Sequence, residues 1–419
     1  MLSRFVPITL VLALVVTATA LRGQRRDAFV LSRDVPAIAY STGAVSEAVT
    51  DLNARLESGA ETLTFDEKSG YLPAVLRALK VPVSSQSLVF SQTSFQGDLI
   101  NMHNPRAVFF NDTTAVGWVR GGEVLEVATV DPRQGVIFYS LEQKRTARPQ
   151  FRRDNQCLAC HLSWDTLGVP GYLLGSMFPL PDDPNAYASG FTTVQGSPIE
   201  QRFGGWWVTG DLGGAPHMGN IPVMPSDKKW KIAAPLKPLK SVEGLFDLSG
   251  YQAPYSDVVA QLVLAHQTRM VNMITRTGWE ARVAAAQPSA DATARVKDAA
   301  ADLVDHLLFV DEAPLPHPVK GTSGFAEQFT TTGPKDSQGR SLRDLDLQQH
   351  LFRYPCSYLI YSKAFDEMPA AAKSAVYARM AVVLNGRDPA PRYKRLTAAD
   401  RKAVLDILKA TKPDLPELR

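Results

Sequence analysis

Three residues that can bind a metal or bond covalently to a cofactor fall within five positions of the chain. The stretch Cys-Leu-Ala-Cys-His places Cys157 and Cys160 three residues apart and His161 directly after them. The whole chain of 419 residues has only three cysteines and seven histidines, so this concentration needs a chemical explanation. The spacing C-x-x-C-H is the attachment signature of c-type haem.

The chemistry of haem attachment explains the spacing. Each thiol can add across one vinyl group of the porphyrin and form a thioether. In a helical turn, residues i and i+3 project to the same side, so both sulfurs can reach one edge of the macrocycle. His161 then follows at a position from which its imidazole can bind the iron as the proximal ligand. We therefore predict one covalent haem c with its iron, attached through Cys157 and Cys160.

Two other uses of the same residues stay open. Cys157 and Cys160 could form a redox dithiol, but the surrounding sequence does not show the βαβ pattern that usually carries one. A structural zinc site would need four ligands, usually with a second Cys/His pair. The remaining cysteine and histidines are scattered singly, and Cys356 lies in an apolar stretch typical of a buried, inert thiol.

The second axial ligand would decide between electron transfer and small-ligand chemistry at such an iron. His217 and Met218 are adjacent in the glycine-rich stretch 204–220, and His217 is the preferred distal candidate. Met218, Met177 and His266 are weaker candidates. Met177 could be a core residue, and His266 lies on the apolar stripe of a predicted helix. A loop histidine bonded to backbone is the structural alternative for His217.

The basic residues of the chain are few and dispersed. Arg152 and Arg153 stand just before the motif and are candidates for pairing with haem propionates, although a solvated basic edge would explain them equally well. The formal net charge is +3, and the chain has no long Lys/Arg run and no basic stripe interleaved with aromatic residues. A nucleic-acid partner is therefore not expected.

The N-terminus predicts export. Residues 1–20 combine an arginine, an apolar stretch at 5–16 and small residues before the expected cleavage site, as in a secretory signal peptide. Three arginines at positions 22 to 26 leave an uncleaved N-terminal anchor as the alternative, and this is the one membrane contact that we expect. Either outcome indicates a periplasmic or otherwise extracytoplasmic protein, which is where c-type haem is attached.

The order of predicted elements gives an α+β fold. Strands punctuated by Asn-Asp, Gly-Gly and Asp-Pro turns at 106–143 indicate an antiparallel meander that leads into the haem loop. Helical patterns dominate from 255 onward, with the longest predicted at 256–285 and capped by Ser256. We expect a mixed haem-bearing region at 27–250 and a mainly helical region at 251–419 packed on it, unlike a simple all-α cytochrome c domain.

Three stretches together carry a family resemblance. The C-L-A-C-H site, the stretch QRFGGWWVTG with HMGN, and the stretch LFRYPCSYLIYSKAF resemble exported bacterial cytochrome c domain-containing proteins. The resemblance implies covalent haem, Cys157 and Cys160 as attachment points, His161 as an axial ligand and an extracytoplasmic location. It implies no particular activity.

Three function classes fit these predictions. The first is a c-type cytochrome that passes single electrons to a redox partner protein. The second is a haem enzyme, peroxidase-like or converting a small ligand, which would need an open distal site and a nearby acid or base. The third is a redox-sensing or partner-binding module whose helical half docks another protein.

Overall fold

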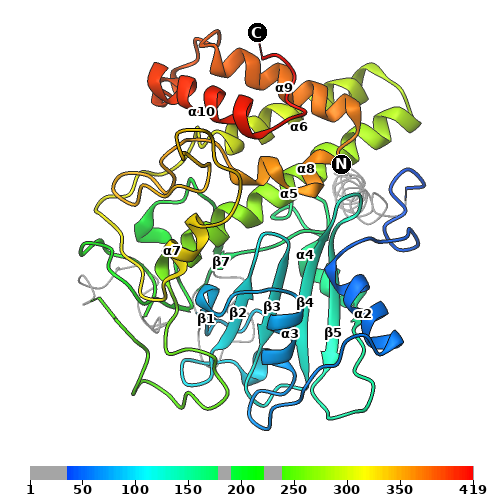
Figure 1. Ribbon diagram of the computed structural model, residues 1–419, viewed down its shortest axis with the longest axis vertical. Helices are drawn as coiled ribbons and strands as arrows, with labels where there is room; N and C mark the ends of the chain where they lie inside the picture. The colour runs from blue at the N-terminus through cyan, green and yellow to red at the C-terminus, as the bar shows by residue number, and fades with distance from the viewer. Residues whose placement is uncertain (1–34, 178–189, 221–237, 419) are drawn as a thin grey trace, which may run out of the picture.

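The predicted α+β class is confirmed by the fold. A computed structural model of the protein describes residues 35–177, 190–220 and 238–418, and the proposed leader at 1–20 lies outside these residues. A twisted antiparallel sheet forms in the N-terminal half, and helices make up the C-terminal half (Figure 1). The helices of the described residues include none long and apolar enough to cross a membrane.

The main sheet has seven strands in the order β6-β5-β4-β3-β2-β1-β9. All of its neighbouring strands pair antiparallel, and β2 to β5 follow one another as the predicted meander. Two further strands, β7 (Gly175–Ser176) and β8 (Phe191–Thr192), form a separate pair. The strands of the main sheet are β1 (Ser87–Val89), β2 (Arg106–Phe110), β3 (Thr114–Trp118), β4 (Val124–Asp131), β5 (Gly135–Glu142), β6 (Arg152–Arg153) and β9 (Trp206–Trp207).

The turns of the meander form where the sequence places short polar side chains. Between β2 and β3, the side-chain oxygen of Asn111 accepts hydrogen bonds from the backbone of Thr113 and Thr114 at 3.0 and 2.9 Å. Between β4 and β5, Asp131 accepts from Arg133 and Gln134 at 2.8 and 2.7 Å. Such Asx-type bonds stabilise tight turns. Residues within each turn therefore bring β2 next to β3 and β4 next to β5.

The two faces of the main sheet differ in burial. Side chains alternate across a strand, so alternate residues share a face. The face toward the viewer in Figure 1, here the front face, is covered by α2 (Ala48–Ser58) and α3 (Leu72–Ala78). Residues of the front face are fully buried or nearly so, namely Ala107, Phe109, Val116, Leu125, Val127 and Ile137. The opposite back face carries the half-buried residues Arg106, Val108, Ala115, Glu126, Ala128 and Ser140, and also the buried residues Phe110, Gly117, Val136 and Phe138.

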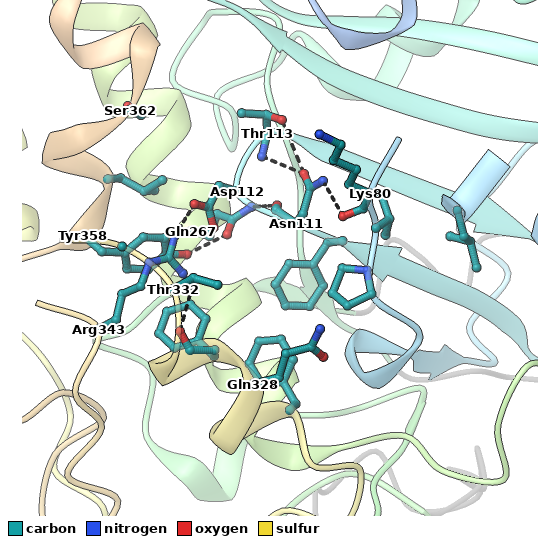
Figure 2. Close-up of a pocket in the computed structure, with 18 of the residues that line it drawn as sticks. Lys80, Asn111, Asp112, Thr113, Gln267, Gln328, Thr332, Arg343, Tyr358 and Ser362 are labelled. Atoms are coloured by element: carbon teal, nitrogen blue, oxygen red, sulfur yellow. Dashed lines mark hydrogen bonds and ion pairs between the residues drawn. The ribbon is translucent and has the colours of Figure 1, made fainter. Parts of the chain in front are cut away.

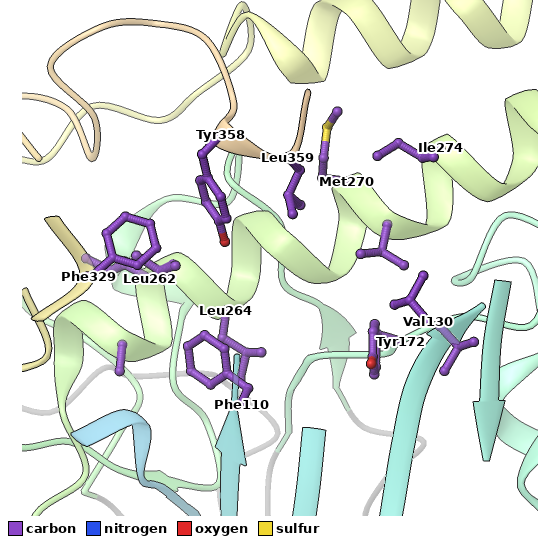
Figure 3. Close-up of a cluster of buried hydrophobic side chains, with 14 of the residues drawn as sticks. Phe110, Val130, Tyr172, Leu262, Leu264, Met270, Ile274, Phe329, Tyr358 and Leu359 are labelled. Atoms are coloured by element: carbon purple, nitrogen blue, oxygen red, sulfur yellow. The ribbon is translucent and has the colours of Figure 1, made fainter. Parts of the chain in front are cut away.

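The C-terminal half is built around one long helix, α5 (Val258–Ala286), which crosses the ends of the strands. Figure 3 shows Leu264 and Ile274 of this helix in the same apolar cluster as Phe110 and Val130 of the sheet. One continuous hydrophobic core therefore joins the two predicted regions. The remaining helices are α4 (Leu158–His161), α6 (Ala290–Leu307), α7 (Phe325–Thr330), α8 (Lys363–Asp366), α9 (Ala370–Leu384) and α10 (Ala398–Thr411).

The predicted cap of α5 is one residue off. Helix α5 begins at Val258, and Asp257 caps it by accepting hydrogen bonds from Val259 and Ala260. Ser256 instead bridges two strands, since its hydroxyl accepts from the backbone of Leu88 and donates to the carbonyl of Trp207. Both residue types are good N-caps, so the sequence alone does not separate them.

Candidate functional site

The Cys-x-x-Cys-His stretch forms a tight helical turn next to the sheet. A single 3-10 turn at Asn155–Cys157 leads into α4, and Asp154 caps this turn by accepting a hydrogen bond from Gln156 at 2.9 Å. Cys157 is half-buried, Cys160 is exposed, and neither thiol is in a disulfide. Burial raises the pKa of the Cys157 thiol to about 12, and the carboxylates of Asp154 and Glu126 add to the shift. The thiol is therefore protonated and is a poor redox nucleophile.

His161 is held by one of its two ring nitrogens. Nδ1 lies 2.9 Å from the carbonyl oxygen of Gly171, which can only accept, so Nδ1 carries the proton. The ring also packs on Phe138 of β5, with 4.8 Å between ring centroids. Burial is the main reason that the pKa of His161 is lowered. The imidazole is thus neutral, with the lone pair on Nε2 uncommitted, which is the state that an axial haem ligand requires.

The support of His161 comes from the helical half. Asn272 of α5 accepts a hydrogen bond from the backbone N–H of Tyr172 at 2.9 Å and donates one to its carbonyl at 2.8 Å. The same side chain lies so close to Gly171 that a Cβ added there would come within 2.4 Å of its oxygen. Gly171 therefore lies between Asn272 of α5 and the His161 ring, which its carbonyl orients. The sequence analysis identified neither Gly171 nor Asn272.

The back face of the sheet carries a half-buried ion pair that acts on the turn electrostatically. Arg106 of β2 reaches over Gly117 to Glu126 of β4, and Gly117 leaves the room for its guanidinium. Glu126 also accepts hydrogen bonds from Ser94 at 2.6 Å and Gln96 at 3.1 Å. Burial alone would raise the pKa of Glu126, but Arg106 and these two bonds outweigh it and lower the pKa.

This pair is electrostatically coupled to the motif. The charges of Arg106 and Glu126 both act on His161 and on Cys157. Nε of Arg106 is buried and has no hydrogen-bond partner among the described residues. A buried guanidinium N–H without a partner is costly and is the kind of donor that an anionic haem propionate would satisfy. The sequence signal was a glutamate inside the apolar strand pattern EVLEVATV, which our prediction did not use.

Arg152 and Arg153 have other partners. Arg152 is exposed and pairs with Glu142 at 3.6 Å. Arg153 donates a hydrogen bond to the carbonyl of Tyr40 at 2.6 Å, and its guanidinium carbon lies 4.6 Å from the centroid of the Tyr40 ring. Both therefore have contacts at the sheet edge, and Nε of Arg153, like Nε of Arg106, is buried without a hydrogen-bond partner among the described residues.

His217 is fixed by its own loop. Its Nδ1 accepts a hydrogen bond from the backbone N–H of Gly219 at 3.1 Å, so the ring proton sits on Nε2. Burial lowers the pKa of His217 to about 4, which keeps the ring neutral. Neither nitrogen offers a free lone pair in this arrangement, and a shift of the proton would be needed before His217 could bind iron.

Two methionines converge near the β9 edge of the sheet. The hydroxyl of Ser176 lies 3.9 Å from the sulfur of Met218, and the side chain of Met177 packs against Gly175 and Gly190. Both methionines are half-buried. The backbone segment 171–177 links Met177 to the Gly171 carbonyl that holds His161. The sulfur of Met218 accepts the Ser176 hydroxyl, so among the four predicted distal candidates Met177 is the one whose donor atom makes no hydrogen bond with the described residues.

His266 is enclosed in the helical core. It is 0 % exposed, with Nδ1 2.7 Å from the side-chain oxygen of Gln195 and Nε2 2.7 Å from the hydroxyl of Ser357. Its ring stacks on His306 and Phe309, with centroid distances of 5.1 and 4.4 Å. Both nitrogens are occupied, so the geometry is that of a satisfied core histidine.

Among the described residues, no three His, Cys, Asp or Glu side chains gather into a group that could hold a metal ion. The four-ligand zinc site considered from the sequence is therefore not assembled by these residues. No protein-family model, no curated protein and no solved structure matches the chain.

Proposed function

We propose that the chain is an exported c-type cytochrome that carries one covalent haem and passes single electrons to a protein partner outside the cytoplasm. The observation that carries the proposal is His161, whose Nδ1–H is anchored on Gly171 at 2.9 Å directly after the Cys157/Cys160 turn. This leaves Nε2 without a hydrogen bond among the described residues, at the position that the attachment signature assigns to the proximal ligand.

The residues around the motif fit a large planar group. When bound, the haem would supply an iron that accepts and releases one electron. Cys157 and Cys160 would hold it through thioethers, and His161 would donate Nε2. Ala115 and Ala128 of the back face have small, half-buried side chains, and the macrocycle would lie against this part of the sheet. Arg106 offers its unpartnered N–H to a propionate.

A second candidate function is supported by the polar pair on the back face. Arg106 and Glu126 place a cation and a carboxylate beside the motif, and both His217 and His266 have their nitrogens occupied. A site with an open sixth position and a charged pair nearby is suited to binding or converting a small ligand. In that case the chain would be a haem enzyme or sensor.

The attachment proposal is tested by expression in a bacterial host that matures c-type cytochromes. We expect a coloured protein whose mass under denaturing conditions equals the processed polypeptide plus one haem. The double variant Cys157→Ala/Cys160→Ala should lose the covalent haem, whereas Cys356→Ala should keep it. Colourless wild-type protein with the mass of the bare polypeptide would overturn the proposal.

The choice between the two functions is tested by spectra of the matured protein. Low-spin iron that does not react with carbon monoxide would support electron transfer, and rapid carbon monoxide binding would support the second function. Met177→Leu, Met218→Leu and His217→Ala are compared in the same assay. If one of them converts low-spin to high-spin iron, that residue is the distal ligand.

A further inference from the structure

A large cavity of the described residues lies away from the Cys157–His161 turn. It has a volume of about 860 Å³ and is lined by α3, the β2–β3 turn, α7 and the segment that precedes α8 (Figure 2). None of its lining residues belongs to the turn that carries Cys157, Cys160 and His161. The volume is in the range of small-molecule sites, which usually hold most of a ligand's surface.

The walls of the cavity are aromatic and firmly packed. Phe110, Phe329 and Tyr358 line it and are only 2 %, 7 % and 2 % exposed, since they also belong to the hydrophobic core (Figure 3). Phe325 and Tyr361 add two further rings to the lining. Such walls are set before any ligand arrives and favour a flat apolar body.

Polar groups in the cavity are held by a fixed network. Arg343 pairs with Asp112, and its guanidinium carbon lies 4.6 Å from the ring centroid of Phe329 and 4.3 Å from that of Tyr358. The hydroxyl of Tyr358 donates to Gln267 at 2.6 Å. Figure 2 shows Arg343, Asp112, Gln267 and Tyr358 together at one side of the cavity. These groups are hydrogen-bonded or ion-paired to one another. They therefore shape the cavity, and a ligand's charge would have to be bound by other residues.

The remaining charge at the cavity is positive. Arg77, Lys80 and Lys363 line it in addition to the Arg343–Asp112 pair, and the lining contains no second carboxylate. Lys363 pairs with Glu367 at 3.6 Å. Within the described part of the chain, the ammonium of Lys80 makes no ion pair and no hydrogen bond. Lys80 is therefore the cation that is available to a ligand.

The backbone of Lys80 supports a role beyond folding. It follows the end of α3 with φ 54°, in the left-handed region where glycine or asparagine usually ends a helix. Asn111 fixes this conformation by donating to the carbonyls of Leu79 and Lys80 at 3.0 and 3.2 Å. Lysine therefore occupies a backbone conformation in which glycine would be less strained.

We propose that this cavity binds a small organic anion with an aromatic body, of which an aromatic carboxylate is the type. The rings of Phe110, Phe325 and Phe329 would contact the apolar body, and Lys80 would pair with the carboxylate. The proposal depends on the cavity alone and stands whether or not the motif carries haem.

The test is isothermal titration calorimetry of the full-length exported protein with 2-naphthoate and with its neutral analogue 2-naphthamide. We expect saturable binding of 2-naphthoate with one site per chain, and affinity for the amide weaker by about fivefold, the size of one partly solvated ion pair. Absence of saturable 2-naphthoate binding, or equal affinity for both compounds, would overturn the proposal.

The variant Lys80→Gly tests whether Lys80 causes the preference for 2-naphthoate over 2-naphthamide. Glycine suits the left-handed backbone at this position, so the variant should fold at least as well as the wild type. It should weaken 2-naphthoate about fivefold and leave 2-naphthamide unchanged. The exposed Lys297 of α6 provides the control, because Lys297→Ala removes the same charge away from the cavity. If Lys80→Gly keeps the wild-type ratio of the two affinities, the proposed site is wrong.

Discussion

The two faces of the main sheet are formed by the same strands but contact different parts of the molecule. On the front face, Phe109, Val116 and Leu125 are all 0 % exposed and lie under the first helices. On the back face, Arg106, Ala115, Glu126 and Ala128 are half-buried, while Phe110 and Phe138 are buried and Phe138 packs on His161. The front face therefore packs against the first helices, and the back face places a charged pair and an aromatic ring near the Cys157–His161 turn. One sheet can carry both because successive side chains point to opposite sides.

The largest expected effect is on the front face. Phe109→Ala should cost about 3 to 5 kcal/mol of unfolding free energy, because it removes a fully buried ring and leaves a cavity. Urea denaturation followed by circular dichroism measures the loss. The visible spectrum of the protein that remains folded should not change. A spectral shift in that folded fraction would show that the two faces are not independent.

The next effect should come from the charged pair of the back face. Glu126→Gln leaves the Arg106 cation without its partner and should cost about 2 kcal/mol at neutral pH, less than a fully buried pair because both side chains keep some exposure. The carboxylate has a lowered pKa in the folded protein, so its contribution is complete above about pH 4.5 and is lost as the pH falls through the folded value. The wild type should therefore lose stability on acidification more steeply than the variant.

Urea denaturation at a series of pH values between about 7 and 3 measures this difference. Glu123→Gln is the matched control, because Glu123 stands three residues earlier and is exposed. Its stability curve should follow that of the wild type. Parallel curves for the wild type and Glu126→Gln would contradict a stabilising role of the charged pair.

A matched pair of substitutions compares the faces directly. Ala107→Leu inserts volume into the buried front face and should cost about 1 to 2 kcal/mol, while Ala128→Leu on the half-buried back face should cost less than about 1 kcal/mol. Haem content, measured by absorbance per protein, should fall only for Ala128→Leu. The reverse pattern would place the haem on the other face or away from the sheet.

The smallest effect concerns the support of His161. Gly171→Ala brings a methyl group within 2.4 Å of the Asn272 side chain and should cost about 1 kcal/mol while shifting the visible spectrum through His161. Gly278→Ala in α5 is the control, since its nearest neighbour lies 3.8 Å away and alanine favours a helix. An unchanged spectrum for Gly171→Ala would mean that the clamp does not orient the ring.

Much of the fold could be predicted because its signals are local. The meander follows from alternating apolar residues and turn residues such as Asn111 and Asp131, which act within three or four positions. The long helix was located from its apolar stripe, and only its cap was misplaced between Ser256 and Asp257. The Cys157–His161 turn could be singled out for the same reason, since its three residues fall within five positions, and its haem stays a prediction.

The support of the site could not be predicted, because it depends on strand register and on distant segments. Arg106 and Glu126 meet only because β3 lies between their strands with a glycine at the crossing point. Asn272 reaches Gly171 from a helix about a hundred residues further along the chain. The same holds for His217, whose backbone bond to Gly219 depends on a loop conformation that glycines permit but do not specify.

The hydrogen bonds of Asn272 to Tyr172 tie the loop next to the Cys157–His161 turn to the helical half of the chain. A fragment that stops at residue 250 would keep both sulfurs and the imidazole of the attachment turn. It would lose the amide that holds the loop beneath that imidazole. Under the proposed function, the chain could therefore not be shortened to a minimal haem peptide, because the helical half holds the loop that orients His161.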